Sequence, residues 1–249
     1  MASEERSGGA RIALVTGATR GIGLATARGL AELGFVVLVG ARDASKGEEV
    51  VRSMVEEGLD AHLLELDITD ERQVRRAAET IDRRYAHLDV LVNNAAVKLE
   101  FHPSPPSAAP LSLVRETFET NVFATMVVIQ AMLPLLRRAD AARVVNLSSG
   151  LGSLGLATTP GSRYRDRPLL SYNVAKAAVN SLTVQFANEL RDTPIKFNAV
   201  DPGYTNTGMT RNTGSRTAEQ AAAVVVRLAT IPPDGPNGGF FDEDGEVPW

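Results

Sequence analysis

The sequence predicts one α/β domain, with a doubly wound parallel sheet of about seven strands and helices on both faces. Short β-branched runs alternate with longer helical segments along the 249 residues. The strand candidates are apolar almost throughout, as is typical of strands buried on both faces. No linker-like stretch divides the chain, and its length is ordinary for a single domain of this class.

The elements follow one another in a regular order. Strands are expected at residues 12–16, 35–40, 61–66, 88–92, 143–147, 195–200 and 239–241. Helices are expected at 22–33, 44–57, 71–85, 113–138, 172–191 and 218–229, where apolar residues recur at i, i+3 and i+4. Repeated strand–helix units of this kind imply right-handed crossovers and a doubly wound sheet.

The composition excludes several classes of function. The formal net charge of -4 argues against nucleic acid as the main partner, which requires clustered Lys and Arg. The chain has no Cys, so disulfides, cysteine–zinc sites and thiol nucleophiles are excluded. Its three His are scattered, so no His-based metal site is expected.

Residues 1–10 are polar and predicted to be a disordered tail without a signal peptide. The apolar runs are too short to span a bilayer, so we expect no membrane partner and a cytoplasmic location.

Three long loops mark the ligand-binding edge of the predicted sheet. They span residues 97–110, 150–170 and 203–216, and each follows the carboxyl end of a predicted strand. The first contains four prolines and is expected to be irregular. Ligands of open α/β sheets bind outside the carboxyl ends of the strands, so these loops are expected to surround the site.

A glycine-rich turn connects the first strand to the first helix. Residues 16–23 read TGATRGIG, so Gly17, Gly21 and Gly23 are spaced G-x-x-x-G-x-G instead of the general G-x-G-x-x-G. Glycines let the backbone approach a pyrophosphate, and the helix that follows offers unpaired N–H groups. The turn therefore indicates a dinucleotide; the alternative is a glycine-rich turn without a ligand.

The chain contains five motifs in order: the glycine turn, Asn93-Asn94-Ala95-Ala96, Ser148-Ser149, Tyr172-Asn173-Val174-Ala175-Lys176 and Asp201-Pro202-Gly203. In this order and separation they resemble the short-chain dehydrogenase/reductase family. Gly40-Ala41-Arg42-Asp43 and the extended segment before Tyr172 resemble its carbonyl-reductase-like branch in particular. The resemblance spans residues 11–241 and implies a Rossmann-type fold and a nicotinamide cofactor. It departs from the family in the separation of 23 positions from Ser149 to Tyr172, which includes an insertion of roughly ten residues.

The second strand indicates which nicotinamide is bound. Enzymes that use NAD usually place a carboxylate at its end, but here Gly40-Ala41-Arg42 occupies that corner. Arg42 and Arg20 would hold a 2′-phosphate, so NADP(H) is predicted; the alternative is that both are ordinary surface cations. The resemblance adds further cofactor contacts: Thr19, Ile22, Asp67, Ile68, Asn94, Ala95, Tyr172, Lys176, Pro202, Gly203, and one of Thr205 and Thr207. Asp67 is alternatively a turn residue resembling a helix cap.

The catalytic candidates centre on Tyr172 and Lys176, four residues apart on one helix face. Ketone reduction needs a proton donor for the developing alkoxide, and a neighbouring ammonium is expected to lower the pKa of the phenol. By resemblance, Ser149, preferred over Ser148, holds the substrate oxygen. By the same resemblance, Asn121 kinks its helix and holds a water that completes a relay through Lys176.

The predicted function is an NADP(H)-dependent oxidoreductase acting on a carbonyl or alcohol, such as a ketone or aldehyde reductase. The alternatives are a NADP(H)-sensing regulator without turnover, which the intact set of four residues disfavours, and an imine reductase or other chemistry on the same scaffold. The substrate pocket is expected to be mostly apolar and lined from the three loops. No arginine obviously marks a carboxylate or acyl-carrier substrate; Arg163, Arg165 and Arg167 are the alternative candidates for one. The apolar candidates for its lining are Leu99, Phe101, Leu151, Leu154, Leu156, Tyr164 and Met209.

A homodimer or homotetramer is expected from the family, although the insertion puts the usual contacts in doubt.

Overall fold

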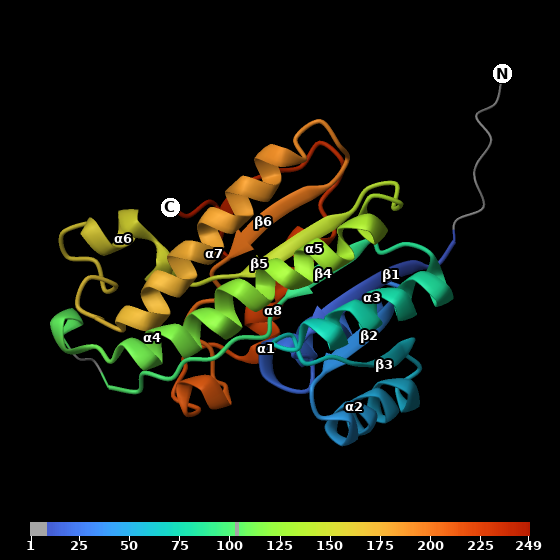
Figure 1. Cartoon of the computed structure of the whole chain (residues 1–249), viewed down its shortest axis with the longest axis horizontal. Helices are drawn as coiled ribbons and strands as arrows, with labels where there is room; N and C mark the ends of the chain where they lie inside the picture. The colour runs from blue at the N-terminus through green and yellow to red at the C-terminus, as the bar shows by residue number, and fades with distance from the viewer. Residues whose placement is uncertain (1–8, 103–104) are drawn as a thin grey trace.

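The chain folds around one parallel sheet of seven strands, as predicted (Figure 1). A computed structural model describes residues 9–102 and 105–249; most of the tail predicted at 1–10 lies outside the described residues. The strand order is β3-β2-β1-β4-β5-β6-β7. The strands are β1 Arg11–Thr16, β2 Phe35–Ala41, β3 Ala61–Glu65, β4 Val90–Asn93, β5 Arg143–Leu147, β6 Lys196–Val200 and β7 Phe240–Phe241. The fourth begins later than predicted because the N–H of Leu88 donates to Leu135 O, outside the sheet.

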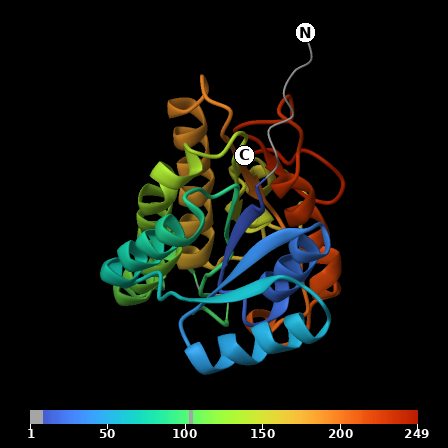
Figure 2. The ribbon, with the colours of Figure 1, turned by 90° about the vertical axis from the view of Figure 1, so that its right-hand side faces the viewer.

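Helices cover both faces of the sheet (Figure 2). Successive residues of β1 point to opposite faces, so Ile12 and Leu14 belong to one core cluster and Ala13 and Val15 to the other. The first cluster is closed by α3 Glu71–Tyr85, α5 Ala124–Leu136 and α7 Leu170–Glu189, and the second by α1 Gly21–Glu32, α2 Ala44–Glu56 and α8 Ala218–Ala229. This arrangement is the single-domain, Rossmann-type fold that the sequence predicts.

Polar caps determine where several helices begin. The Asp70 carboxylate accepts from the N–H groups of Arg72 and Gln73 at the start of α3. A reciprocal capping box between Thr217 and Gln220 begins α8. These starts were placed correctly from the sequence because the capping residues are local signals.

The long helix predicted at residues 113–138 is interrupted. It consists of α4 Leu111–Phe118, a π-helical turn at Glu119–Phe123, and α5. The run Leu111–Leu136 is long and apolar enough to cross a membrane by length and composition, unlike the shorter apolar runs expected from the sequence, but half of its most apolar window is buried. Its buried residues, such as Val128 and Met132, belong to the core under the sheet, so it is a core helix.

The predicted loops contain short helices. A 3-10 turn at Pro106–Ala108 interrupts the proline-rich loop, because proline is compatible with the first turn of a helix. The second loop contains a 3-10 turn at Gly150–Gly152 and α6 Leu154–Thr158, and the third a 3-10 turn at Gly208–Thr210. The strand order reverses between β1 and β4, so the switch point where such folds bind dinucleotides lies next to the glycine turn.

Candidate active site

The glycine turn has the backbone geometry that its spacing implied. Gly17 and Gly21 have φ of 64° and 54°, which only glycine adopts readily. Gly23 is helical, but a Cβ there would lie 2.4 Å from Asn94 Nδ2 and 2.5 Å from the Gly17 carbonyl oxygen. No side chain caps the first turn of α1. The turn therefore leaves backbone N–H groups available for an anion at the helix start.

Asn94 supports this turn from the neighbouring strand. Its side-chain amide donates to Thr16 O at 2.8 Å and to Gly17 O at 3.1 Å. In return, Thr16 Oγ1 accepts from the N–H groups of Asn94 and Ala95 at 3.0 and 3.1 Å. Asn94 thus fixes the shape of the glycine turn, and its expected role as a cofactor contact stays a prediction.

The fold supports only some of the contacts predicted for the adenosine half of the cofactor. Arg20 and Arg42 are both exposed, at the start of α1 and after β2. Asp67 Oδ1 accepts from the N–H of Thr69 at 3.0 Å and from its hydroxyl at 2.7 Å, which is the turn role considered as the alternative. Ile68 is 8% exposed and packs in the core, so little of it is left for an adenine.

Tyr172 and Ser149 line one cavity of about 220 Å³ at the carboxyl ends of the strands. Ile22 and Pro202, two predicted cofactor contacts, line the same cavity. Lys176 is buried behind it, with Nζ 5.7 Å from the centre of the Tyr172 ring. Its ammonium donates to Leu147 O at 2.6 Å, at the end of β5. The structure therefore brings together three of the four predicted catalytic residues.

The pKa of Tyr172 is shifted in the opposite direction to the one expected. Burial raises it well above the usual range for a phenol, and the negative charge of Asp201 raises it further. Burial also lowers the pKa of Lys176 to about 8. Near pH 8, Lys176 is partly deprotonated and therefore stabilises a tyrosinate less than a full positive charge would. The sequence did not reveal that the Asp201 carboxylate lies close enough to raise the pKa of Tyr172.

The two neighbouring serines have different partners. Ser148 is buried, and its hydroxyl donates to Lys176 O at 3.3 Å, so it holds α7 against β5. Ser149 faces the cavity, where its oxygen accepts from the N–H of Leu151 at 3.2 Å and its proton remains available to a substrate. This difference supports Ser149 as the residue that contacts the substrate oxygen.

Asn121 lies in the π-helical turn, as its expected helix distortion suggests. Its side chain exchanges two hydrogen bonds of 2.8 Å with the backbone N–H and C=O of Val97. Asn121 therefore positions the segment that follows β4, and both ends of its amide are engaged there. The water relay to Lys176 stays a prediction.

The cavity surface is mostly apolar, as expected, although several charged side chains also line it. Of the three arginines considered from the sequence, Arg163 and Arg167 line it and Arg165 does not. Its predicted lining is correct for Leu151, Tyr164 and Met209, the last with its sulfur 4.0 Å from the Tyr172 hydroxyl. Leu99, Phe101, Leu154 and Leu156 do not line it. Leu154 is 70% exposed, whereas Leu156 packs on the C-terminal core cluster, because the insertion folds toward the C-terminus. Charged side chains take their places: Lys98, Arg163, Arg167 and Asp201.

Two buried carboxylates near Tyr172 were missed by the sequence analysis. Asp201 accepts from the N–H of Gly203 at 3.0 Å and from the Tyr164 hydroxyl at 3.2 Å, so it connects β6 to the insertion. Glu100 accepts from the backbone N–H of Tyr172 at 3.1 Å and fixes the start of α7. Asp201 belongs to the Asp201-Pro202-Gly203 motif, but the sequence does not show that its carboxylate lies close enough to raise the pKa of Tyr172.

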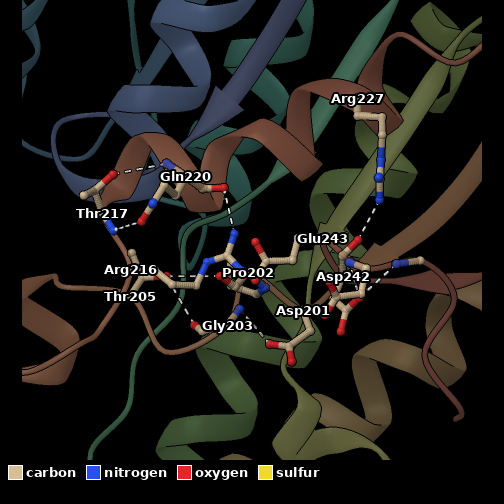
Figure 3. Close-up of polar contacts among 12 residues, drawn as sticks. Asp201, Pro202, Gly203, Thr205, Arg216, Thr217, Gln220, Arg227, Asp242 and Glu243 are labelled. Atoms are coloured by element: carbon tan, nitrogen blue, oxygen red, sulfur yellow. Dashed lines mark hydrogen bonds and ion pairs between the residues drawn. The ribbon is translucent and has the colours of Figure 1, made fainter.

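The third loop folds back on itself and is fastened to the C-terminal segment (Figure 3). Thr205 and Arg216 form a parallel bridge, and the Arg216 guanidinium pairs with Glu243 and donates to Gln220 O at 3.0 Å. Thr205 is buried, and its hydroxyl donates to the carbonyls of Pro202 and Gly203.

Thr207 lies beside the glycine turn, with its methyl group 3.2 Å from where a Cβ on Gly21 would lie. Both threonines considered as cofactor contacts have partners in their own loop, Thr205 at Pro202 and Gly203 and Thr207 in a capping box with Thr210. Thr207 is the one that lies beside the glycine turn.

Comparison with known proteins agrees with this geometry. The family model described as short chain dehydrogenase matches residues 11–218. Carbonyl reductase (NADPH) 1 of Homo sapiens is 32% identical over 283 residues, an alignment that covers 98% of this chain and all 100% of the relative. A short-chain dehydrogenase of Penicillium roqueforti is 34% identical over 226 residues and covers 88% of each chain.

Solved structures give the same result. The NADPH-bound carbonyl reductase from chicken fatty liver superposes with a TM-score of 0.83 at 25% identity, over 96% of this chain and 99% of the other. The matched segment includes the glycine turn, Ser149, Tyr172 and Lys176. The chain belongs to the short-chain dehydrogenase/reductase family of oxidoreductases.

Proposed function

We propose that the protein is an NADP(H)-dependent reductase of ketones or aldehydes. The observation that carries the proposal is the cavity shared by Ser149 and Tyr172, with Lys176 buried behind the tyrosine ring. The names of the human and chicken relatives, both NADPH carbonyl reductases, support the cofactor and the substrate class. NADPH, when bound, would supply the hydride.

The residues of the chain fit a dinucleotide. The positive φ of Gly17 and Gly21 and the close approach at Gly23 form a cradle that a Cβ would fill. Arg20 and Arg42 would hold the 2′-phosphate, which needs no carboxylate at the end of β2. Thr207 would approach the pyrophosphate side from the third loop.

Tyr172 serves as the proton donor and Ser149 as the hydrogen-bond donor to the substrate oxygen. Burial and the charge of Asp201 raise the pKa of Tyr172, so it is a phenol at neutral pH, which is the form that protonates an alkoxide in the reductive direction. When the phenol gives up its proton, Lys176 stabilises the tyrosinate and supplies a route for reprotonation. Asn121 holds Val97 and, with it, the wall of the site.

The first experiment measures loss of NADPH absorbance against ketones, aldehydes, diketones and cyclic imines, with NADH in parallel. Reduction of a ketone or aldehyde with NADPH preferred is the expected result. Preferential turnover of cyclic imines would transfer the assignment to an imine reductase. Tight NADPH binding without oxidation by any of these compounds would favour a sensing regulator and overturn the proposed reaction.

We also propose a cytoplasmic homo-oligomer, a dimer or a tetramer. The long apolar helix is a core helix, but Phe123 in the π-helical turn and Val174 on α7 are 48% and 44% exposed and would be covered in an oligomer. Light scattering on the purified protein tests this: a mass of one chain, 26.6 kDa, would contradict it.

A further inference from the structure

Three cations from three separate loops gather at the mouth of the cavity. Lys98 follows β4, Arg167 precedes α7, and Arg211 follows the 3-10 turn at Gly208–Thr210. Lys98 and Arg167 line the cavity. Lys98 Nζ and the Arg211 guanidinium lie 5.9 and 4.5 Å from the centre of the same Phe101 ring, so these two cations are neighbours.

Aromatic rings orient these cations without neutralising them. Arg167 lies 5.6 Å from the centre of the ring of Tyr204, which itself lines the cavity. Cation–π contacts of this kind fix the direction of a guanidinium but leave its full charge in place. The three cations are therefore held in a definite arrangement around the opening.

The three cations make no ion pair and no side-chain hydrogen bond with any residue in the described ranges 9–102 and 105–249. The two buried carboxylates of the site are engaged elsewhere, Glu100 by the N–H of Tyr172 and Asp201 by Gly203 and Tyr164. A chain with a formal net charge of -4 thus concentrates uncompensated positive charge at one opening.

The electrostatics at Lys98 reflect this crowding. Burial lowers the pKa of Lys98, the nearby Tyr204 phenol acts in the opposite direction, and the positive charges of Arg211 and Arg167 lower it further. Like charges held close together without a counter-ion raise the free energy of the ligand-free protein. An anion at this position would relieve the repulsion, and guanidinium groups are well suited to bind carboxylates or phosphates.

We propose that the carbonyl substrate carries an anionic group, a carboxylate or a phosphate, which Lys98, Arg167 and Arg211 bind while the carbonyl faces Ser149 and Tyr172. This inference rests on the proposed reductase function and adds the substrate class. The rings of Phe101 and Tyr204 provide an apolar surface for the part of the substrate near its charged end.

The test uses matched ketones that differ in charge: 4-acetylbenzoate and 4-(4-acetylphenyl)butanoate, each against its primary amide, and 4-acetylphenyl phosphate. At low ionic strength, we expect kcat/KM for at least one acid to exceed that of its amide by tenfold or more, mainly through KM. Added salt is expected to reduce this ratio, because the cations are partly exposed. A phosphate preferred over both acids would identify a phosphorylated substrate.

Arg167→Met is expected to reduce the acid-to-amide ratio to about one, and Lys98→Met and Arg211→Met to reduce it in the same direction. Arg165→Met is the matched control: it removes an exposed arginine from the same loop that does not line the cavity, so it is expected to keep the wild-type ratio. A parallel rise in KM for NADPH in the variants of Lys98, Arg167 and Arg211 would mean that the cations bind the cofactor, and would overturn the inference.

Two outcomes separate the inference from the function on which it rests. Equal kcat/KM for acids and amides would overturn the anionic substrate and leave the reductase in place. If no ketone is reduced, the reductase fails, and calorimetric titration of the protein–NADPH mixture with 4-(4-acetylphenyl)butanoate and its amide decides the anion site. Tighter binding of the acid that is lost in Arg167→Met would support the site, and equal binding would overturn it.

Discussion

Gly23→Ala is expected to damage both stability and cofactor binding, because the added methyl has no space. Its Cβ would lie 2.4 Å from Asn94 Nδ2 and 2.5 Å from Gly17 O, far inside ordinary van der Waals contact. Neither neighbour is free to move. The Gly17 oxygen is backbone, and Asn94 Nδ2 is held at 2.8 Å by Thr16 O.

The magnitude follows from two effects. Overpacking of this kind costs about 1–3 kcal/mol. Displacing the Asn94 amide weakens two hydrogen bonds, at about 1 kcal/mol each. Alanine's higher helix propensity offsets about 0.5–1 kcal/mol. The free energy of unfolding should therefore fall by about 2–4 kcal/mol, which corresponds to a decrease in Tm of roughly 4–16 °C for a domain of this size.

Gly29→Ala on the same helix is the matched control. A Cβ at Gly29 meets Val226 Cγ2 at 3.0 Å, a contact that a shift of a few tenths of an ångström relieves. The gain in helix propensity, about 0.5–1 kcal/mol, offsets the cost of this shift, so the stability should stay close to that of wild type.

The assay is thermal unfolding of wild type and both variants, with and without NADPH. Saturating NADPH at one hundred times Kd should stabilise wild type and Gly29→Ala by about 2.7 kcal/mol. Gly23→Ala should lose most of this stabilisation, because the turn that receives the pyrophosphate is displaced. A Gly23→Ala protein with wild-type Tm and a full NADPH-induced shift would refute the reasoning.

Three further predictions concern the catalytic and cofactor residues. Tyr172→Phe should lower kcat by about a hundredfold or more and leave the Kd for NADPH intact; normal turnover would remove Tyr172 from the mechanism. Arg42→Ala should raise the KM for NADPH far more than that for NADH, and equal losses would mean that Arg42 does not contact the 2′-phosphate. Burial lowers the pKa of Lys176 to about 8 from 10.5, so in this range the unfolded chain binds more protons, and this residue makes stability rise with pH between about 8 and 10.5. Thermal unfolding should show this rise in wild type but a flatter profile in Lys176→Met; identical profiles would contradict the assigned cause.

Much of the fold was predictable because its signals are local. The buried strands are apolar along their whole length, and capping residues such as Asp70 and Thr217 stand beside the helices they begin. The spacing of Gly17, Gly21 and Gly23 indicated the turn, because the first two need a positive φ and the third has no space for a Cβ. The π-helical turn was harder to predict, because it goes with a hydrogen bond between Asn121 and Val97, which lie 24 positions apart in the chain.

The sequence by itself determined the class of site, whereas the tertiary structure decided its electrostatics. Tyr172 and Lys176 share a helix face because they are four residues apart, which any reader of the sequence can count. The raised pKa of Tyr172 depends on its burial and on the charge of Asp201. The cationic opening depends on three loops that bring Lys98, Arg167 and Arg211 together. Charges act over distances in space, and the distances between loops are established only when the strands that carry them pair in one sheet.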